Sequence, residues 1–409
     1  MDDRVGGAGQ EDQGFDTSKL LKNAARQRDE RNYDDFLIID VDSHHYETEA
    51  FREIAGYIRD PVLRNEALYQ GAGSGGITSE LGNYQSMAGR VTRYPGRRKE
   101  KTPVAPHRDI TLMRRWMDAM GVDIACMFPT PMLNLASCQR IDVQVGLATA
   151  YNQWLCERIL AEDSRLKSML YLPLHSPSAC EEIIAEFADR KGVIGFMVTA
   201  PHYASVYDNA YAKSYAALQE RGLPLAFHAG FPSGDQALKL TNRFIGLHAL
   251  GFPWFNMIHM TNWIINGMSE RFPQLKTIWI ESGLAWIPFL MQRLDNEFMM
   301  RTSDAPLLKR LPSEYMQEMF YSSQPMERVR NAKALEVTFE MINAPSQLLY
   351  SSDYPHWDMD LPSTIYDLPF LDEVAKRNIL GENARKLFKL GNELSDTKLA
   401  RRQARGGER

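Results

Sequence analysis

Residues 36–45 read FLIIDVDSHH, an almost continuous apolar run that ends in carboxylate and imidazole side chains. Strands buried on both faces of a parallel sheet have this composition, because neither face meets water. Other short runs along the chain share it, and amphipathic stretches of helical period separate most of them. The predicted strands are FLIIDVD (36–42), IACMFP (124–129), MLYLPL (169–174), VIGFMV (193–198), PLAFHAG (224–230), KTIWIE (276–281), MFYSS (319–323) and QLLYSSD (347–353).

Eight strands that alternate with helices predict an α/β fold, the (β/α)8 TIM barrel. An open, doubly wound sheet is the competing architecture. No GxGxxG fingerprint follows the first run, which argues against the nucleotide-binding form of that sheet. The helices expected between the strands cover 108–120, 142–162, 178–191, 209–221, 261–271, 284–300 and 327–343.

The chain has 409 residues, enough for one large barrel or for two smaller domains. We expect one barrel over 34–392, with a flexible N-terminal arm over 1–33 and a polar C-terminal tail over 393–409, because both ends lack apolar periodicity. Residues 68–107, after the first strand, join a glycine-rich stretch to a basic run. They are predicted to form a lid-like insertion or a subunit contact, with a solvated loop as the alternative.

Composition excludes several classes of protein. The net charge is −5, whereas nucleic-acid-binding domains usually carry a basic excess. No apolar run reaches the roughly 18 residues that cross a bilayer, and the polar N-terminus has no signal core. The four cysteines contain no CxxC pair and do not resemble a disulfide framework. We therefore expect a cytoplasmic protein that binds neither nucleic acid nor a membrane.

Candidate catalytic side chains follow the predicted strands. In this barrel the active site lies at the carboxyl ends of the strands, and five of those ends carry His, Asp or Glu. Asp42 and His44 are two residues apart, so both point to the same side of an extended strand. The other ends contribute His202, His228, Glu281 and Asp353.

A divalent cation is the expected partner of such a set, because buried titratable groups are costly without one. Two imidazoles and two carboxylates fit zinc as the default ion, and manganese or iron is compatible. His45 alternates to the opposite face from His44 and is expected to be structural.

Substrate contacts are expected from loops near the barrel mouth. Six basic residues lie between 90 and 101, and Arg93 and Arg97 among them could pair with a substrate carboxylate. His356 and Trp254 are further candidates. We therefore expect a small, anionic substrate.

Five segments carry a resemblance when they are taken in order. They are IIDVDSHHYE (38–47), LPLAFHAGF (223–231), NGMSERFPQLKTIWIESGLAWIPFLMQRLD (266–295), YSSDYPHWD (350–358) and ILGENARKLFKL (379–390). Together they resemble the amidohydrolase superfamily, and within it the branch of aminocarboxymuconate-semialdehyde decarboxylase and the hydroxybenzoate decarboxylases. The resemblance covers about residues 36–392. It implies a (β/α)8 barrel with a catalytic divalent metal held by Asp42, His44, His228 and Asp353.

The chain departs from that family pattern at two positions. Its first strand has Asp-x-His where much of the family has His-x-His or Glu-x-His. Decarboxylases of the branch commonly carry a histidine at the end of strand six, where this chain has Glu281. Glu281 and His202 could supply donors for a second metal ion, as in members of the branch that use two ions for thioester hydrolysis or oxygen-dependent hydroxylation.

The leading hypothesis is a metal-dependent hydrolase or nonoxidative decarboxylase of a small carboxylate or acyl substrate. A metal-activated water would serve the chemistry, Asp353 or Glu281 would move the proton, and His228 would complete the catalytic group. One alternative is a dinuclear iron or manganese oxygenase on the same fold. Another is a structural subunit of a hetero-oligomer, and we expect a homo- or hetero-oligomer in any case. The sequence leaves the substrate, the metal and the reaction open.

Overall fold

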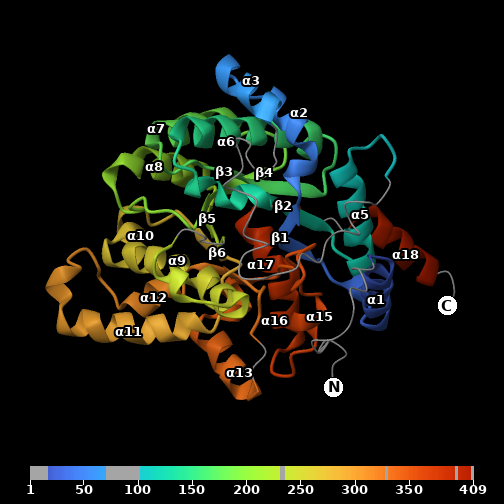
Figure 1. The fold of residues 1–409 in the computed structure, drawn as a ribbon. Coiled ribbons are helices and arrows are strands. Elements are labelled where there is room, and N and C mark those ends of the chain that lie inside the picture. Colours follow the sequence, from blue (N-terminus) through green and yellow to red (C-terminus); the bar gives the residue numbers. More distant parts are fainter. Residues whose placement is uncertain (1–16, 71–101, 231–234, 328–329, 392–394, 407–409) are drawn as a thin grey trace.

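Eight parallel strands pair in chain order, so the prediction of a (β/α)8 barrel is confirmed (Figure 1). The computed structural model describes residues 17–70, 102–230, 235–327, 330–391 and 395–406. Each predicted apolar run overlaps one strand. The strands are β1 (Ile39–His45), β2 (Ile124–Pro129), β3 (Leu166–Tyr171), β4 (Val193–Thr199), β5 (Leu225–His228), β6 (Thr277–Ile280), β7 (Phe320–Ser322) and β8 (Leu348–Leu349).

The segment that follows β8 completes the closure of the barrel against β1. Val41 N–H donates to Tyr350 O at 3.0 Å, and His44 N–H donates to Tyr354 O at 2.6 Å. Between these bonds, the backbone N–H of Asp353 donates to the carbonyl oxygen of Asp42 at 2.8 Å. Because β8 itself is short, this closure is what places Asp353 beside β1.

Helices surround the strands, as Figure 1 shows. The larger ones are α5 (Arg108–Met120), α6 (Ile141–Leu155), α7 (Pro177–Phe187), α8 (Ala212–Arg221), α9 (Phe244–Ile265), α11 (Trp286–Met300) and α13 (Ala332–Met341). The shorter ones include α2 (Phe51–Gly56), α3 (Pro61–Gln70), α10 (Met268–Arg271), α12 (Pro312–Met316), α14 (Ala344–Gln347), α15 (Ser363–Tyr366), α16 (Glu373–Arg377) and α17 (Asn383–Leu387).

Helix α9 begins at Phe244, well before the predicted start at residue 261. The stretch 244–260 contains no Asp, Glu, Lys or Arg, so it has no charged face from which helical period can be recognised. Pro253 lies inside the helix, and a proline within a sequence argues against a continuous helix there. The prediction for this element was therefore wrong at its N-terminal end.

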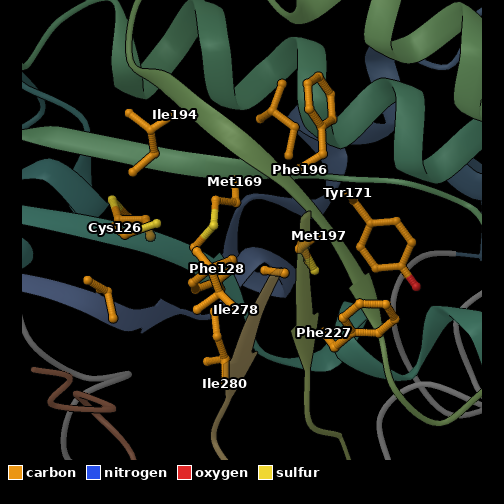
Figure 2. Close-up of a cluster of buried hydrophobic side chains, with 14 of the residues drawn as sticks. Cys126, Phe128, Met169, Tyr171, Ile194, Phe196, Met197, Phe227, Ile278 and Ile280 are labelled. Atoms are coloured by element: carbon orange, nitrogen blue, oxygen red, sulfur yellow. The ribbon is translucent and has the colours of Figure 1, made fainter. Parts of the chain in front are cut away.

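Apolar side chains from β2 to β6 form a continuous core, part of which Figure 2 shows. Phe128, Phe196 and Phe227 have no exposed surface. Burying a side chain of this size contributes about 1.5–3 kcal/mol. The packed strands thus form a rigid support for the residues at their carboxyl ends.

Helices lie within both segments that were expected as polar arms, and both helices contact the barrel. Helix α1 (Thr17–Glu30) packs against α5, where Arg28 donates to the carbonyl oxygen of Asp118 at 2.7 Å. In α18 (Asp396–Gly406), the buried ammonium of Lys398 donates to Asp123 Oδ2 at 2.6 Å. A buried charge needs such a partner, so this ion pair holds α18 in place.

The predicted insertion over 68–107 begins with the end of α3 and leads to α5. Residues 71–101, with Arg93 and Arg97, lie outside the described residues, so their roles stay predictions. In the described part of the chain, no helix combines the length and the apolar character needed to cross a membrane. The four cysteines are buried and free.

Candidate metal centre

The structure brings four of the predicted site residues together at the carboxyl end of the barrel. Asp42 and His44 lie on the same face of β1, His228 is the last residue of β5, and Asp353 follows β8. His44 Nε2 lies 3.1 Å from Asp42 Oδ1 and 3.2 Å from Asp353 Oδ1. His228 Nε2 lies 3.2 Å from Asp42 Oδ1. All four side chains are buried, so their donor atoms face one another and not solvent.

Both imidazole rings of this group are oriented by backbone carbonyl groups. His44 Nδ1 donates to Pro129 O at 2.9 Å, and His228 Nδ1 donates to Ala229 O at 2.8 Å. When Nδ1 carries the proton, the lone pair of Nε2 points toward the carboxylates. Metal-binding histidines typically donate their other ring nitrogen in this way.

Several donor atoms of the group have no hydrogen-bond partner although they are buried. They are Asp42 Oδ2, Asp353 Oδ2 and His44 Nε2. Each buried, unpaired polar atom costs about 1–3 kcal/mol, and more when the group is charged. A divalent cation among these oxygen and nitrogen donors would satisfy them all, so the residues fit the metal that the sequence predicted.

The carboxylates and imidazoles strongly perturb one another. Burial acts to raise the pKa of Asp42, but the charges of His228 and His44 outweigh it and lower that pKa. Burial acts to lower the pKa of His44, while Asp42 and Asp353 raise it to about 10. The cluster therefore attracts positive charge, which either a proton or a metal ion can provide. Metal binding must compete with protons at such a site.

Glu281 and Asp353 both adopt the left-handed backbone conformation, with φ of 58° and 56°. This region costs of order 1–3 kcal/mol for residues other than glycine, and functional sites often hold such strain. The N–H of Glu281 donates to Ser322 Oγ at 2.9 Å and helps to maintain the turn. Both carboxylates are thus held at sharp turns beyond the ends of their strands.

Glu281 borders the group of four ligand candidates. Its Oε2 lies 3.6 Å from His228 Nδ1 and has no hydrogen-bond partner, and the residue is 4% exposed. Burial, together with the charges of Asp353 and Asp42, raises the pKa of Glu281 well above its ordinary value. Burial therefore favours the protonated form of this carboxyl group, which could donate its proton beside the centre.

His356, predicted from the sequence as a substrate contact, lies inside the centre. Its Nδ1 donates to Asp353 Oδ1 at 2.6 Å, and its ring stacks on His44 with the centroids 4.3 Å apart. Its Nε2 accepts from Thr130 Oγ1 at 3.3 Å. His44, Asp353 and His356 form a second group able to hold a cation, alongside Asp42, His44 and His228. The contact to Thr130 had no sequence signal, because it joins two loops that are distant in the chain.

The other predicted residues are not among the ligand candidates that these groups contain. His202 is buried, its ring stacks on His259 at 4.2 Å, and its Nε2 has no hydrogen-bond partner. Within the described residues, neither group able to hold a cation includes His202 or Glu281. Trp254 lies on α9 and is 37% exposed. His45 bonds to Asp109 and Tyr151, in keeping with the structural role expected of it.

A cavity of about 350 Å³ opens among the loops that follow β2, β3, β4 and β5. His175 Nδ1 donates to Gln144 Oε1 at 3.0 Å, which leaves Nε2 as an acceptor toward a ligand. Tyr203 donates to Asp235 Oδ2 at 3.3 Å, and Phe255 adds an aromatic wall. No Lys or Arg belongs to the described lining, whose charged side chain is the carboxylate of Asp235.

The comparison with protein families identifies one match. Residues 117–390, well over half of the chain, match the family model described as amidohydrolase. Two curated relatives are γ-resorcylate decarboxylases. The one from Polaromonas sp. (strain JS666) is 25% identical over 297 residues, 68% of this chain and 86% of the relative. The one from Rhizobium sp. (strain MTP-10005) is 24% identical over 298 residues, 67% of this chain and 85% of the relative.

Solved structures share the fold. The 5-carboxyvanillate decarboxylase of Sphingomonas paucimobilis superposes with a TM-score of 0.63 at 19% identity, over 87% of this chain and 100% of that one. A dihydroxybenzoic acid decarboxylase of Polaromonas sp. JS666, solved with manganese and the inhibitor 2-nitroresorcinol, gives a TM-score of 0.59 at 18% identity, over 87% of this chain and 97% of that one. At this level of identity the similarity establishes the barrel architecture.

Proposed function

The chain belongs to the amidohydrolase family, and on this premise we propose that it is a metal-dependent, nonoxidative decarboxylase of a small aromatic acid. One observation carries the proposal: unsatisfied donor atoms on Asp42, His44 and Asp353 gather beside His228, next to the buried carboxyl group of Glu281. The curated relatives named above are decarboxylases of a hydroxylated aromatic acid. A structural subunit without activity would have no need of a strained, desolvated donor set.

In the proposed reaction, Asp42, His44, His228 and Asp353 hold the divalent cation. When bound, the cation supplies a Lewis acid that polarises a substrate oxygen. Manganese is supported by the dihydroxybenzoic acid decarboxylase solved with that ion, and zinc remains compatible with the donor set.

Glu281 acts as the general acid. It donates its proton to the ring carbon that bears the carboxylate, and the bond from this carbon to the carboxyl carbon then breaks. The bonding electron pair returns to the ring and carbon dioxide leaves. The Glu281 carboxylate takes a proton from water before the next turnover, so the net reaction consumes one proton and no oxidant.

The cavity beside the barrel mouth is proposed to receive the part of the substrate that lies away from the reacting carbon. His175 Nε2 and the Asp235 carboxylate offer acceptors for hydroxyl groups. A second carboxylate would be repelled by Asp235. Recognition of the reacting carboxylate is proposed for Arg93 and Arg97, and Trp254 remains a proposed contact.

Hydrolysis is the second candidate. Glu281, once deprotonated, could act as the base for a metal-activated water, as carboxylates do in metal-dependent hydrolases. The unpartnered Oε2 of Glu281 favours this possibility as well. The oxygenase alternative lacks comparable support, because His202 and Glu281 share no cation-holding group in the described residues.

The decisive experiment combines metal analysis with product analysis. Purified protein is stripped of metal, reloaded with manganese, zinc or iron, and incubated with carboxyl-labelled 2,6-dihydroxybenzoate, and separately with aryl esters. Release of labelled carbon dioxide that requires metal supports decarboxylation. Ester cleavage without such release would replace decarboxylation by hydrolysis, and full activity in stripped protein would refute both.

A further inference from the structure

Glu47 is a buried carboxylate that the proposed reaction does not use. It follows β1 by two residues and is 1% exposed. Its two oxygens accept from two backbone groups of the next loop: Oε1 from Met132 N–H at 2.7 Å and Oε2 from Thr130 N–H at 2.9 Å. Glu47 therefore clamps the corner at residues 129–132, where the chain leaves β2.

The same corner makes two contacts with the candidate metal centre. Pro129 O accepts from Nδ1 of His44 at 2.9 Å and so sets the orientation of that ring. Thr130 Oγ1 donates to Nε2 of His356 at 3.3 Å, and His356 in turn donates to Asp353 Oδ1 at 2.6 Å. One clamped corner thus orients a ligand candidate on β1 directly and a ligand candidate after β8 through His356.

We propose that Glu47 is a positioning residue of the metal centre, acting through Pro129 and Thr130 on His44 and Asp353. A neutral side chain could also hold a loop, but an amide has a single oxygen, and its NH2 group would face one of the two N–H groups. Only a carboxylate meets both donors with separate oxygens. The inference deepens the proposed function and rests on it for its metal-binding readout, whereas its geometric readout is independent of any metal.

The test compares Glu47→Gln with a matched control, Asp123→Asn. Asp123 is equally buried and also accepts two backbone N–H groups, from Ile38 at 2.9 Å and Ser395 at 2.8 Å. Asp123 lies at the opposite end of β1 from the centre, because its partner Ile38 immediately precedes the first residue of that strand. Both variants lose a buried acceptor, and Asp123→Asn also leaves the Lys398 ammonium without its carboxylate, so both are expected to lose stability, Asp123→Asn the more. Only Glu47→Gln should disturb the centre.

Two measurements compare the variants with the native protein. The first is the dissociation constant for manganese, determined by competition with a chelator. Replacing a residue that orients a metal ligand typically weakens metal binding or activity by roughly 10- to 100-fold. Glu47→Gln is therefore expected to weaken manganese binding at least about tenfold. The second is the imidazole nitrogen NMR shifts of His44 and His356 in metal-free protein at one pH, which should move in Glu47→Gln and stay in place in Asp123→Asn.

Thr130→Val is a second variant for the case in which Glu47→Gln does not fold. It removes the hydroxyl contact to His356 and keeps the backbone clamp, so the His356 shifts should move while those of His44 stay. The proposal is overturned if Glu47→Gln binds manganese within twofold of the native protein with unchanged imidazole shifts, or if Asp123→Asn shows the same losses. Absence of manganese binding by the native protein would refute the proposed function. The imidazole shifts of the metal-free protein would still test whether Glu47 orients His44 and His356.

Discussion

Replacing Glu281 by glutamine should slow turnover by orders of magnitude and at the same time stabilise the metal-free protein. The substitution keeps the shape of the side chain and removes the proton that the reaction needs. Loss of a general acid typically slows a reaction by about 10²- to 10⁴-fold, which corresponds to roughly 3–5 kcal/mol of activation free energy. We expect kcat to fall within that range while manganese binding persists, because Glu281 stands beside the ligand group and not in it.

The gain in stability follows from the raised pKa of Glu281, whose ordinary value is 4.5. In the folded state burial keeps the proton on this side chain, whereas the unfolded chain releases it as pH rises above about 4.5. The unfolded state therefore binds fewer protons, and the native protein loses stability with increasing pH. Each pH unit above 4.5 lowers the free energy of unfolding by at most about 1.4 kcal/mol for as long as the folded protein keeps this proton. Glutamine does not ionise in either state, and the variant escapes this loss.

Urea unfolding of the metal-free native and variant proteins at pH 5, 6 and 7 measures the effect. The variant should be the more stable, and its advantage should grow with pH. Glu297→Gln, a change on the surface of α11, serves as the control and should shift the unfolding free energy by less than about 1 kcal/mol with kcat unchanged. A kcat within threefold of native for Glu281→Gln, or a stability difference that shrinks as pH rises, would refute the reasoning.

Three further outcomes are expected. His228→Ala should lower both metal content and turnover, measured by elemental analysis and product formation; native metal content in this variant would exclude His228 as a ligand. Saturating manganese at about 100 times its dissociation constant should stabilise the native protein by about 2.7 kcal/mol, seen as a rise of the unfolding temperature, and no rise would contradict the metal site. Lys398→Ala should destabilise the protein by about 3–5 kcal/mol in urea unfolding, because it leaves Asp123 buried without its cation, and its metal affinity should match that of the native protein.

Much of the fold could be predicted because the relevant signals are local. An apolar run reports burial on both faces of a strand, and each predicted run overlaps a strand of the barrel. Helix α9 was recognised only in part, because its uncharged first half lacks the contrast between faces that helical period depends on. The packing of α18 was not predicted, because a polar tail reveals nothing of the buried partner that Lys398 finds in Asp123.

The sequence by itself determined the kind of chemistry available at the carboxyl ends of the strands. The spacing of Asp42 and His44 places both on one face of a strand, and the ends of other strands add His228, Glu281 and Asp353. Residue type and strand period are properties of neighbouring positions, so they can be read along the chain. The sequence does not show which donor atoms lack a hydrogen-bond partner, because this depends on every group that surrounds them in space.

Only the tertiary structure decided how these residues act together. Closure of the barrel brings Asp353 beside β1, and the turns at Glu281 and Asp353 hold their backbones in a conformation that a sequence pattern does not reveal. The same closure places His356 against His44, and the pairing of β1 with β2 places Glu47 against the corner at 129–132. These contacts join residues far apart in the chain, and hydrogen bonding and burial are fixed by position in space, not by order in the sequence.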